Sequence, residues 1–277
     1  MTDTPRGAYG LRIGHPVEDA YLTDVPLEWP EWRLEWRATP ADQRQAQRVS
    51  PDAALLDLLP EGQVLVERST RTATFLLPER PPTEAWAHPH LSTTAVIASS
   101  WLGRRSFHAG AFIAGAGAWG VLGEKGDGKT SMMAWLVKSG YPIVCDDTLV
   151  VDKDQAMAGP RCIDLRHGAA DYFQLGTYIG HIGTRERWRA QVAAVPPTAP
   201  FRGWVVPTWG DDVRVGPVPA AQRLPLLVAR RGFRVPEADD GKWLDLLALP
   251  MVSFQRPQDW SAMDVGMTHL LDQLADL

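Results

Sequence analysis

The chain has 277 residues, of which 45% are hydrophobic and 22% charged, a composition typical of a globular protein. The formal net charge of −5 argues against nucleic acid as a partner, because proteins that bind it are usually basic. No apolar run reaches the roughly 18 residues of a membrane span, and the polar first ten residues do not resemble a secretion signal. The two cysteines, Cys145 and Cys162, lack metal-site spacing and favour a reduced, cytoplasmic setting with no membrane partner.

The first segments of the chain predict mainly β-structure. Residues 32–37 alternate apolar and charged side chains, which favours a half-buried strand, although Trp29, Trp32 and Trp36 would also share a helix face. Two runs rich in Val, Thr and Phe, residues 63–68 and 70–77, read as strands joined by a tight turn. Residues 51–59 are predicted to form a short helix that ends at Pro60.

A proline cluster, Pro78, Pro81 and Pro82, interrupts regular structure and is the best candidate for a linker. We therefore expect a small β-rich (α+β) domain over residues 1–90, with a candidate substrate-binding role. Residues 91–277 would form the second domain. Strands and helices alternate in this second part, which predicts an α/β fold with a mixed sheet.

The second part begins with a helix and then a β-hairpin, after which helices and strands alternate. Gly115-Ala116-Gly117 is the predicted turn of the hairpin, and Gly140 closes the helix that follows it. A loop is predicted over residues 196–200. The expected helices span residues 92–102, 130–138, 219–229 and 260–277, and the expected strands span residues 106–114, 118–122, 141–145, 149–152, 161–166 and 203–207.

Residues 123–130, Gly-Glu-Lys-Gly-Asp-Gly-Lys-Thr, match the Walker A pattern of a phosphate-binding P-loop without a mismatch. Glycines let backbone N–H groups surround a phosphate, and the helix that follows adds its positive end. Lys129 would reach the β- and γ-phosphates of ATP, and the Thr130 hydroxyl would face Mg²⁺. The predicted nucleotide-binding residues are Gly123, Glu124, Lys125, Gly126, Asp127, Gly128, Lys129, Thr130 and Ser131.

Two carboxylates, Asp146 and Asp147, end the strand that follows the P-loop helix. The right-handed crossover rule makes this strand parallel to the P-loop strand, so the pair should lie at the edge of the sheet where the phosphates bind. One carboxylate would hold Mg²⁺, and the other would accept the proton of a substrate hydroxyl. The sequence does not decide which residue takes which role.

Three further positions are candidates for the same site. With the hairpin turn near Ala116, antiparallel pairing places His108 opposite residue 124, at the mouth of the phosphate loop. Asp164 would be a second metal-binding carboxylate, and Arg166 or Arg161 would neutralise the transferred phosphoryl group. The run Arg185, Arg187 and Arg189 is either a solvated face or a grip on an acidic group.

Residues 106–151, which contain His108, the P-loop and the Asp146-Asp147 pair in this order, resemble the catalytic core of the bacterial HPr serine kinase/phosphorylase family. The residues Ile163-Asp164-Leu165-Arg166 are similar to a metal-binding stretch of that family. The overall layout also resembles HPr-kinase-related proteins of ribosomal-peptide and lasso-peptide biosynthesis. These resemblances imply a P-loop kinase fold of the HPr-kinase type and a chain that can form homo-oligomers.

The resulting prediction is an ATP- and Mg²⁺-dependent kinase that phosphorylates a Ser hydroxyl of a protein or peptide. Its expected catalytic residues are Asp146, Asp147, His108, Lys129 and Arg166, and its expected metal ligands are Thr130, Asp147 and Asp164. Two alternatives stay open: a kinase for a small-molecule hydroxyl, and a nucleotide-gated peptide-binding protein without phosphoryl transfer.

Overall fold

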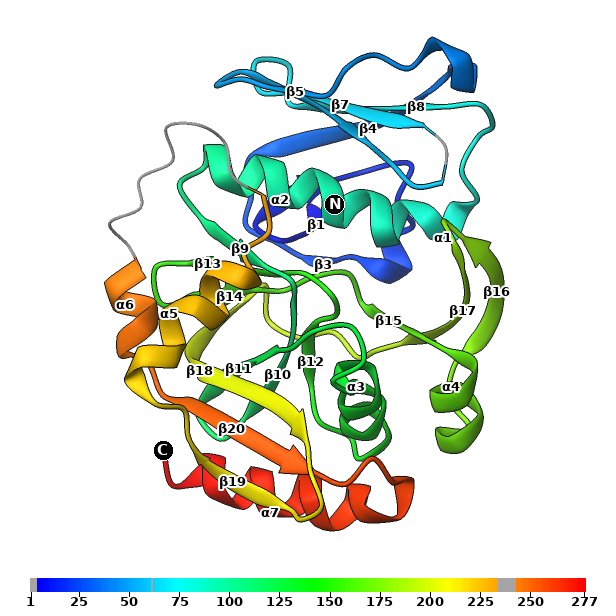
Figure 1. Ribbon diagram of the computed structural model, residues 1–277. Coiled ribbons are helices and arrows are strands. Elements are labelled where there is room, and N and C mark those ends of the chain that lie inside the picture. Colours follow the sequence, from blue (N-terminus) through cyan, green and yellow to red (C-terminus); the bar gives the residue numbers. More distant parts are fainter. Residues whose placement is uncertain (1–3, 61, 234–242) are drawn as a thin grey trace.

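A computed structural model describes residues 4–60, 62–233 and 243–277. The fold is mixed α/β, with three sheets and with helices packed between and beside them (Figure 1). No helix in the described part of the chain is long and apolar enough to cross a bilayer.

The first sheet is built from the N-terminal part of the chain. Its parallel pairs are β2–β4 and β4–β8, and its other pairs are antiparallel. In sheet order its eight strands are β3 (Thr23–Asp24), β1 (Arg6–Ala8), β2 (Leu11–Ile13), β4 (Glu31–Ala38), β8 (Thr72–Leu77), β7 (Gln63–Glu67), β6 (Ala53–Asp57) and β5 (Arg48–Val49). Short helical turns lie at η1 (Asp19–Tyr21) and η2 (Ala41–Gln43).

The second sheet carries the glycine-rich loop, residues 123–130. Its main path is β12 (Ile143–Cys145), β10 (Ala109–Ala114), β11 (Gly117–Leu122), β18 (Thr198–Trp209), β14 (Gln155–Met157), β13 (Leu149–Asp152) and β9 (Arg105–Phe107). Two more strands join it at β18: β20 (Met251–Arg256), and β19 (Arg214–Pro217) beyond it. The third sheet is antiparallel, in the order β15 (Cys162–Leu165), β17 (Arg185–Gln191) and β16 (Thr177–Ile182).

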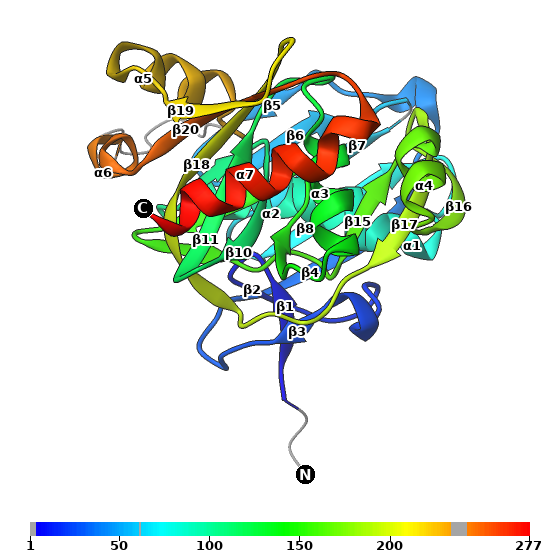
Figure 2. The same ribbon diagram turned by 90° about the horizontal axis from the view of Figure 1, so that it is seen from below.

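The helices cover both faces of the second sheet. Helix α2 (Leu91–Trp101) runs between the first and second sheets (Figure 1), while α3 (Lys129–Lys138) and α7 (Met263–Ala275) lie on the opposite face (Figure 2). Alternation along β11 explains this arrangement, because Trp119 and Val121 pack with α3 and α7 while Ala118 and Leu122 pack toward α2. The remaining helices are α1 (Thr83–Ala85), η3 (Trp86–His90), α4 (His167–Phe173), α5 (Ala220–Ala229), α6 (Trp243–Ala248) and η4 (Trp260–Ala262).

Most of the predicted elements are confirmed, including the hairpin, its turn and the strand character of residues 32–37. The helix predicted over residues 51–59 is wrong: Ala54 and Leu55 are buried in β6, between β5 and β7, so sheet packing outweighs local helix preference. The loop predicted over residues 196–200 is wrong from Thr198 onward, where β18 begins. The strand predicted over residues 106–114 is broken at His108.

The predicted domain boundary near residue 90 stays a prediction. One hydrophobic cluster crosses that position, because Leu11 and Phe75 of the first sheet belong to the same packed core as Phe107, Val150 and Trp204 of the second. The N-terminal sheet is therefore packed directly onto the part of the molecule that carries the glycine-rich loop.

Candidate functional site

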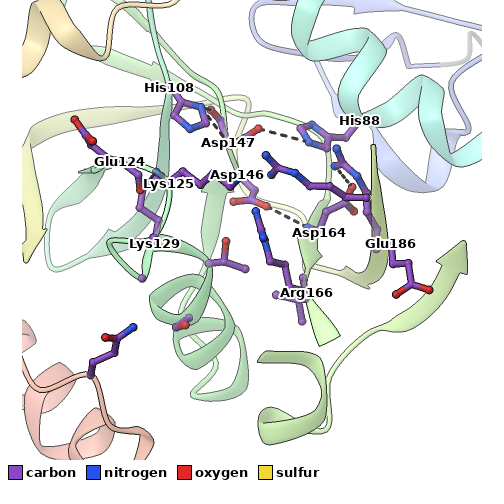
Figure 3. A pocket seen from close by; sticks show the side chains of 18 of the residues that line it. His88, His108, Glu124, Lys125, Lys129, Asp146, Asp147, Asp164, Arg166 and Glu186 are labelled. Carbon is purple, nitrogen blue, oxygen red and sulfur yellow. Dashed lines mark hydrogen bonds and ion pairs between the residues drawn. The ribbon is translucent and has the colours of Figure 1, made fainter. Parts of the chain in front are cut away.

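A cavity with a volume of about 940 Å³ opens where β11 meets α3. Side chains from the second and third sheets, from η3 and from the loops between elements line it (Figure 3). Sequence-predicted residues in its wall are His108, Glu124, Lys125, Gly126, Gly128, Lys129, Thr130, Ser131, Asp146, Asp147, Asp164 and Arg166. Gly123 and Asp127 belong to the same loop but do not line the cavity, and Arg161 is also outside its wall.

The glycine-rich loop passes directly from β11 into α3. Gly126 and Gly128 have positive φ values of 106° and 81°, a backbone region that favours glycine. A Cβ atom on Gly128 would lie 2.2 Å from Arg256 Nη2, so this position also needs glycine for lack of space. The loop closes on itself, because the Asp127 carboxylate accepts a hydrogen bond from the backbone N–H of Glu124.

Lys129 folds back along this loop. Its Nζ donates to the carbonyl oxygens of Gly123 and Glu124, at 2.6 Å and 3.1 Å. Burial lowers the pKa of Lys129, and the carboxylate of Asp147 acts in the opposite direction. The ammonium group is thus held at the start of α3, where an anion would receive both its charge and that of the helix terminus.

Asp146 and Asp147 follow β12, as the sequence predicted, and β12 runs parallel to β11 with β10 between them. Asp146 is half-buried and accepts a hydrogen bond of 3.1 Å from the backbone N–H of Asp164. Burial, followed by the charge of Asp147, raises the pKa of Asp146 to about 7. Asp147 has a left-handed φ of 61°, and its side chain is 46% exposed toward the cavity.

Two histidines flank the Asp147 carboxylate from different segments (Figure 3). His108 Nδ1 lies 3.2 Å from Asp147 Oδ1 and 3.0 Å from the Asp147 backbone oxygen, both acceptors, so this nitrogen carries the hydrogen. His88 Nε2 lies 3.8 Å from Asp147 Oδ2. His108 was predicted opposite residue 124 and lines the cavity, but the observed pair of Ala109 with Leu122 places it opposite residue 123, one residue away.

An ion-paired wall, formed by Asp164 with Arg187 and Arg189, adjoins His88. Arg187 Nη1 donates to Asp164 Oδ2 at 2.8 Å, and Arg189 Nε donates to Asp164 Oδ1 at 2.7 Å. Burial alone would raise the pKa of Asp164, but the Arg189 hydrogen bond and the surrounding positive charges together outweigh burial, and the pKa is lowered. The predicted metal ligand Asp164 thus binds two guanidinium groups, and its role toward a metal stays a prediction.

The three arginines of β17 have different environments: Arg189 is buried, whereas Arg185 is exposed at the cavity. Arg189 is 4% exposed, donates to the backbone oxygens of Glu84 and His88, and lies over the Tyr21 ring. Arg185 is exposed and lines the cavity beside the tip of the β16–β17 hairpin, and exposed Arg166 lines it just before α4. The expected solvated face is therefore wrong for Arg189, which is a buried structural cation.

Sequence reasoning missed Arg256, which comes from the far end of the chain. Its side chain is almost fully buried, stacks 4.3 Å from the Trp209 ring centroid and donates to the Gly128 carbonyl at 3.2 Å. Burial lowers its pKa to about 10, and its Nε and Nη1 have no hydrogen-bond partner within the described residues. The available signal was a strand-like stretch, residues 251–255, followed by Arg256-Pro257, but nothing local connected it to residue 128.

Within the described residues, no group of three or more His, Cys, Asp and Glu side chains is arranged to hold a metal ion. Oxygen donors are nevertheless present on both sides of the loop, in the Thr130 hydroxyl and the Asp146 carboxylate, and both line the cavity. This small donor set is of the kind that Mg²⁺ uses when phosphate oxygens complete its coordination.

Comparisons with known proteins give little independent information. No protein-family model matches the sequence, and no curated protein matches it significantly. One solved structure that matches is described as the structure of the Hpr(Ser) kinase/phosphatase from Coxiella burnetii, with 13% sequence identity and a TM-score of 0.31. The match covers 62% of this chain and 97% of that one. At this level of similarity the function has to be argued from the residues of the chain itself.

Proposed function

We propose that the protein is an ATP-dependent phosphotransferase that moves the γ-phosphoryl group to a hydroxyl, with the Ser side chain of a protein or peptide as acceptor. The observation that carries this proposal is the shared cavity, in which the glycine-rich loop and Asp147 face the same space. A site that only bound nucleotide would not need a half-exposed carboxylate held by a histidine beside the phosphates.

The phosphates would bind at the glycine-rich loop and the first turn of α3. Backbone N–H groups at a helix start suit an anion, and Lys129 would exchange its two carbonyl contacts for phosphate oxygens. Arg256 supplies a buried cation with two unused donor nitrogens next to Gly128. The three features together favour a highly charged polyphosphate over a single carboxylate.

Mg²⁺ fits the donor set, with Thr130 and Asp146 as the residues that would hold it. When bound, the ion neutralises negative charge on the phosphate oxygens. Asp146 suits this role because it ends β12 directly and stays close to the sheet edge. Asp164 would contribute indirectly, because its ion pairs hold Arg187 and Arg189 in place.

Asp147 would receive the acceptor proton. The hydroxyl oxygen attacks the γ-phosphorus, the bond to the β–γ bridging oxygen breaks, ADP leaves, and the hydroxyl proton passes to Asp147. His108 donates through Nδ1 to Asp147 and thereby orients the carboxylate. Arg166 lines the same cavity and would face the transferred phosphoryl group.

The acceptor has room beyond Asp147. The cavity continues to the β16–β17 hairpin, residues 183–187, and to the exposed side chain of Leu59 in the segment that follows β6. Two separate surface loops at the opening favour a peptide segment as the acceptor. A small hydroxyl compound is the second candidate, because Arg166 and Arg185 would bind an anionic group on it.

The test compares wild type with Asp147→Asn in ATP binding, ATP turnover and phosphoryl transfer to a panel of Ser peptides and small hydroxyl compounds. We expect Asp147→Asn to bind ATP as wild type does and to lose about 10²–10⁴-fold in turnover. Asp154→Asn, an exposed carboxylate on the β13–β14 turn, is the matched control. Wild-type protein that binds ATP and peptide without turnover would refute the kinase and favour the nucleotide-gated peptide-binding protein.

A further inference from the structure

A buried chain of polar side chains leads from the N-terminal sheet to Asp147. The Tyr9 hydroxyl lies 3.2 Å from Ser92 Oγ, and Ser92 Oγ lies 3.0 Å from His88 Nδ1. His88 Nε2 then faces Asp147 Oδ2 at 3.8 Å. The first three residues are 0%, 5% and 7% exposed, so water does not compete for these contacts.

The direction of the hydrogen bonds follows from the chemistry of each group. Burial raises the pKa of Tyr9 well above its ordinary value, so its hydroxyl keeps its hydrogen. Burial lowers the pKa of His88, so its ring is neutral and carries a single N–H. If Tyr9 donates to Ser92 and Ser92 donates to Nδ1, the hydrogen of His88 must reside on Nε2.

The opposite arrangement is unfavourable at both ends. A hydrogen on Nδ1 would turn the lone pair of Nε2 toward the Asp147 carboxylate. It would also make Ser92 Oγ accept from Nδ1, so that either the Ser92 hydrogen or, if Ser92 donates to Tyr9, the Tyr9 hydrogen would need another buried acceptor. Only one tautomer therefore satisfies the chain from Tyr9 to Asp147.

The backbone of His88 is anchored by the ion-paired wall. Arg189 Nη2 donates to the His88 carbonyl at 3.1 Å while Arg189 Nε donates to Asp164. Both the ring and the backbone of His88 are thus fixed. The separation from Asp147 is longer than a hydrogen bond, and catalytic contacts of this kind commonly tighten when substrate binds.

We infer that His88 is a positioning residue for Asp147: the Tyr9–Ser92 pair fixes the Nε2–H tautomer of His88, which holds the Asp147 carboxylate toward the acceptor hydroxyl. The N-terminal sheet is then part of the catalytic machinery through Tyr9. This inference rests on the proposed function for its catalytic consequence, while the tautomer itself can be measured without any turnover.

The kinetic test uses His88→Leu, His88→Gln and Ser92→Ala in the full chain. We expect His88→Leu to lower kcat about 10–100-fold with little change in the KM for ATP, as for other residues that orient a catalytic group. His88→Gln keeps a donor and should recover much of this loss. Ser92→Ala should lower kcat a few-fold in wild type and have no further effect in the His88→Leu background, since it acts through that ring.

The matched control is Thr94→Val, which removes another buried hydroxyl from α2. Thr94 donates to the carbonyl of His90 one turn earlier and does not line the cavity. We expect this variant to keep kcat and KM. If Thr94→Val and Ser92→Ala lower kcat equally, the effect of Ser92 is a general loss of helix stability and the inference fails.

The second readout is the tautomer of His88 by ¹⁵N NMR, assigned through the signal lost in His88→Gln. We expect the Nε2–H form in wild type and a mixture of both forms in Ser92→Ala. A protonated Nδ1 in wild type, or an unchanged tautomer in Ser92→Ala, would overturn the inference. An Nε2–H tautomer in a protein without any ATP turnover would instead refute the proposed function and leave the hydrogen-bond chain standing.

Discussion

The glycine-rich loop and the ion-paired wall face each other across one cavity, but they are built in different ways. The loop is continuous in sequence, and its ligand groups would be backbone N–H groups and one lysine from residues 123–130. The wall is assembled by side chains far apart in sequence: Arg189 reaches Asp164 and the backbone of residues 84 and 88. In the proposed kinase, local geometry would therefore set the affinity for phosphate, and long-range packing would set where the acceptor lies.

The largest expected effect concerns the loop. Lys129→Ala removes the cation at the start of α3 and should lower ATP turnover on the order of 10³-fold, with weaker nucleotide binding. Lys125→Ala, at a position of the same loop that the motif leaves free, is the control and should change turnover less than about threefold. Equal losses in both variants would mean that the loop contributes only general positive charge.

The next effect concerns the wall. Arg189→Leu leaves the Asp164 carboxylate, 4% exposed, with one of its two arginines, so the free energy of unfolding should fall by about 3 kcal/mol. Arg185→Leu, at the exposed end of the same strand, should change it by less than about 0.5 kcal/mol. Urea unfolding measures both values. A small effect of Arg189→Leu would show that the wall is not what holds the third sheet in place.

A smaller effect is expected when a side chain is added in the tightly packed glycine-rich loop. Gly128→Ala combines a positive φ with a Cβ that would lie 2.2 Å from Arg256 Nη2 and 2.8 Å from the Trp209 ring. We expect a loss of about 1–3 kcal/mol in stability and weaker ATP binding. Gly168→Ala, in helix α4 with open space around the added atom, should be neutral or slightly stabilising. Thermal unfolding with and without ATP separates the two contributions.

The smallest effect is a pH dependence of the free energy of unfolding, caused by the buried ring of His90 in η3. This ring packs on Phe75 at 4.3 Å, and burial lowers its pKa to about 3. The unfolded chain takes up a proton near pH 6.5 and the folded chain does not, so stability is fully present above pH 6.5 and is lost as the pH falls. The loss by pH 5.5 is about 1.4 kcal/mol.

His90→Phe removes this titration and should make the free energy of unfolding less dependent on pH between 8 and 5. His181→Gln, which changes an exposed histidine on β16, should leave the wild-type dependence unchanged. Urea unfolding at several pH values measures the slopes. An identical slope in His90→Phe and wild type would assign the acid sensitivity to other groups.

The loop was predictable because its information is local. The Walker A pattern, its flanking strand and helix and the Asp146-Asp147 pair follow each other within about 30 residues, and the crossover rule connects them. His88 and Arg256 were not predictable, because only packing brings them to the cavity. Arg189 shows the same limit, since a charged run gives no sign of which guanidinium is buried against Asp164. The false helix at residues 51–59 came from treating an apolar run as local when β5 and β7 pair with it.

The central position of β18 affects the order in which the site can form. Its parallel partner on one side is β11, through Val121 and Val205, and on the other side β20. During synthesis the glycine-rich loop emerges long before the strand that supports β11, and Arg256 emerges later still. Because such distant pairings form late, the proposed nucleotide site should form in the nascent chain only after the segment that carries Arg256 has emerged.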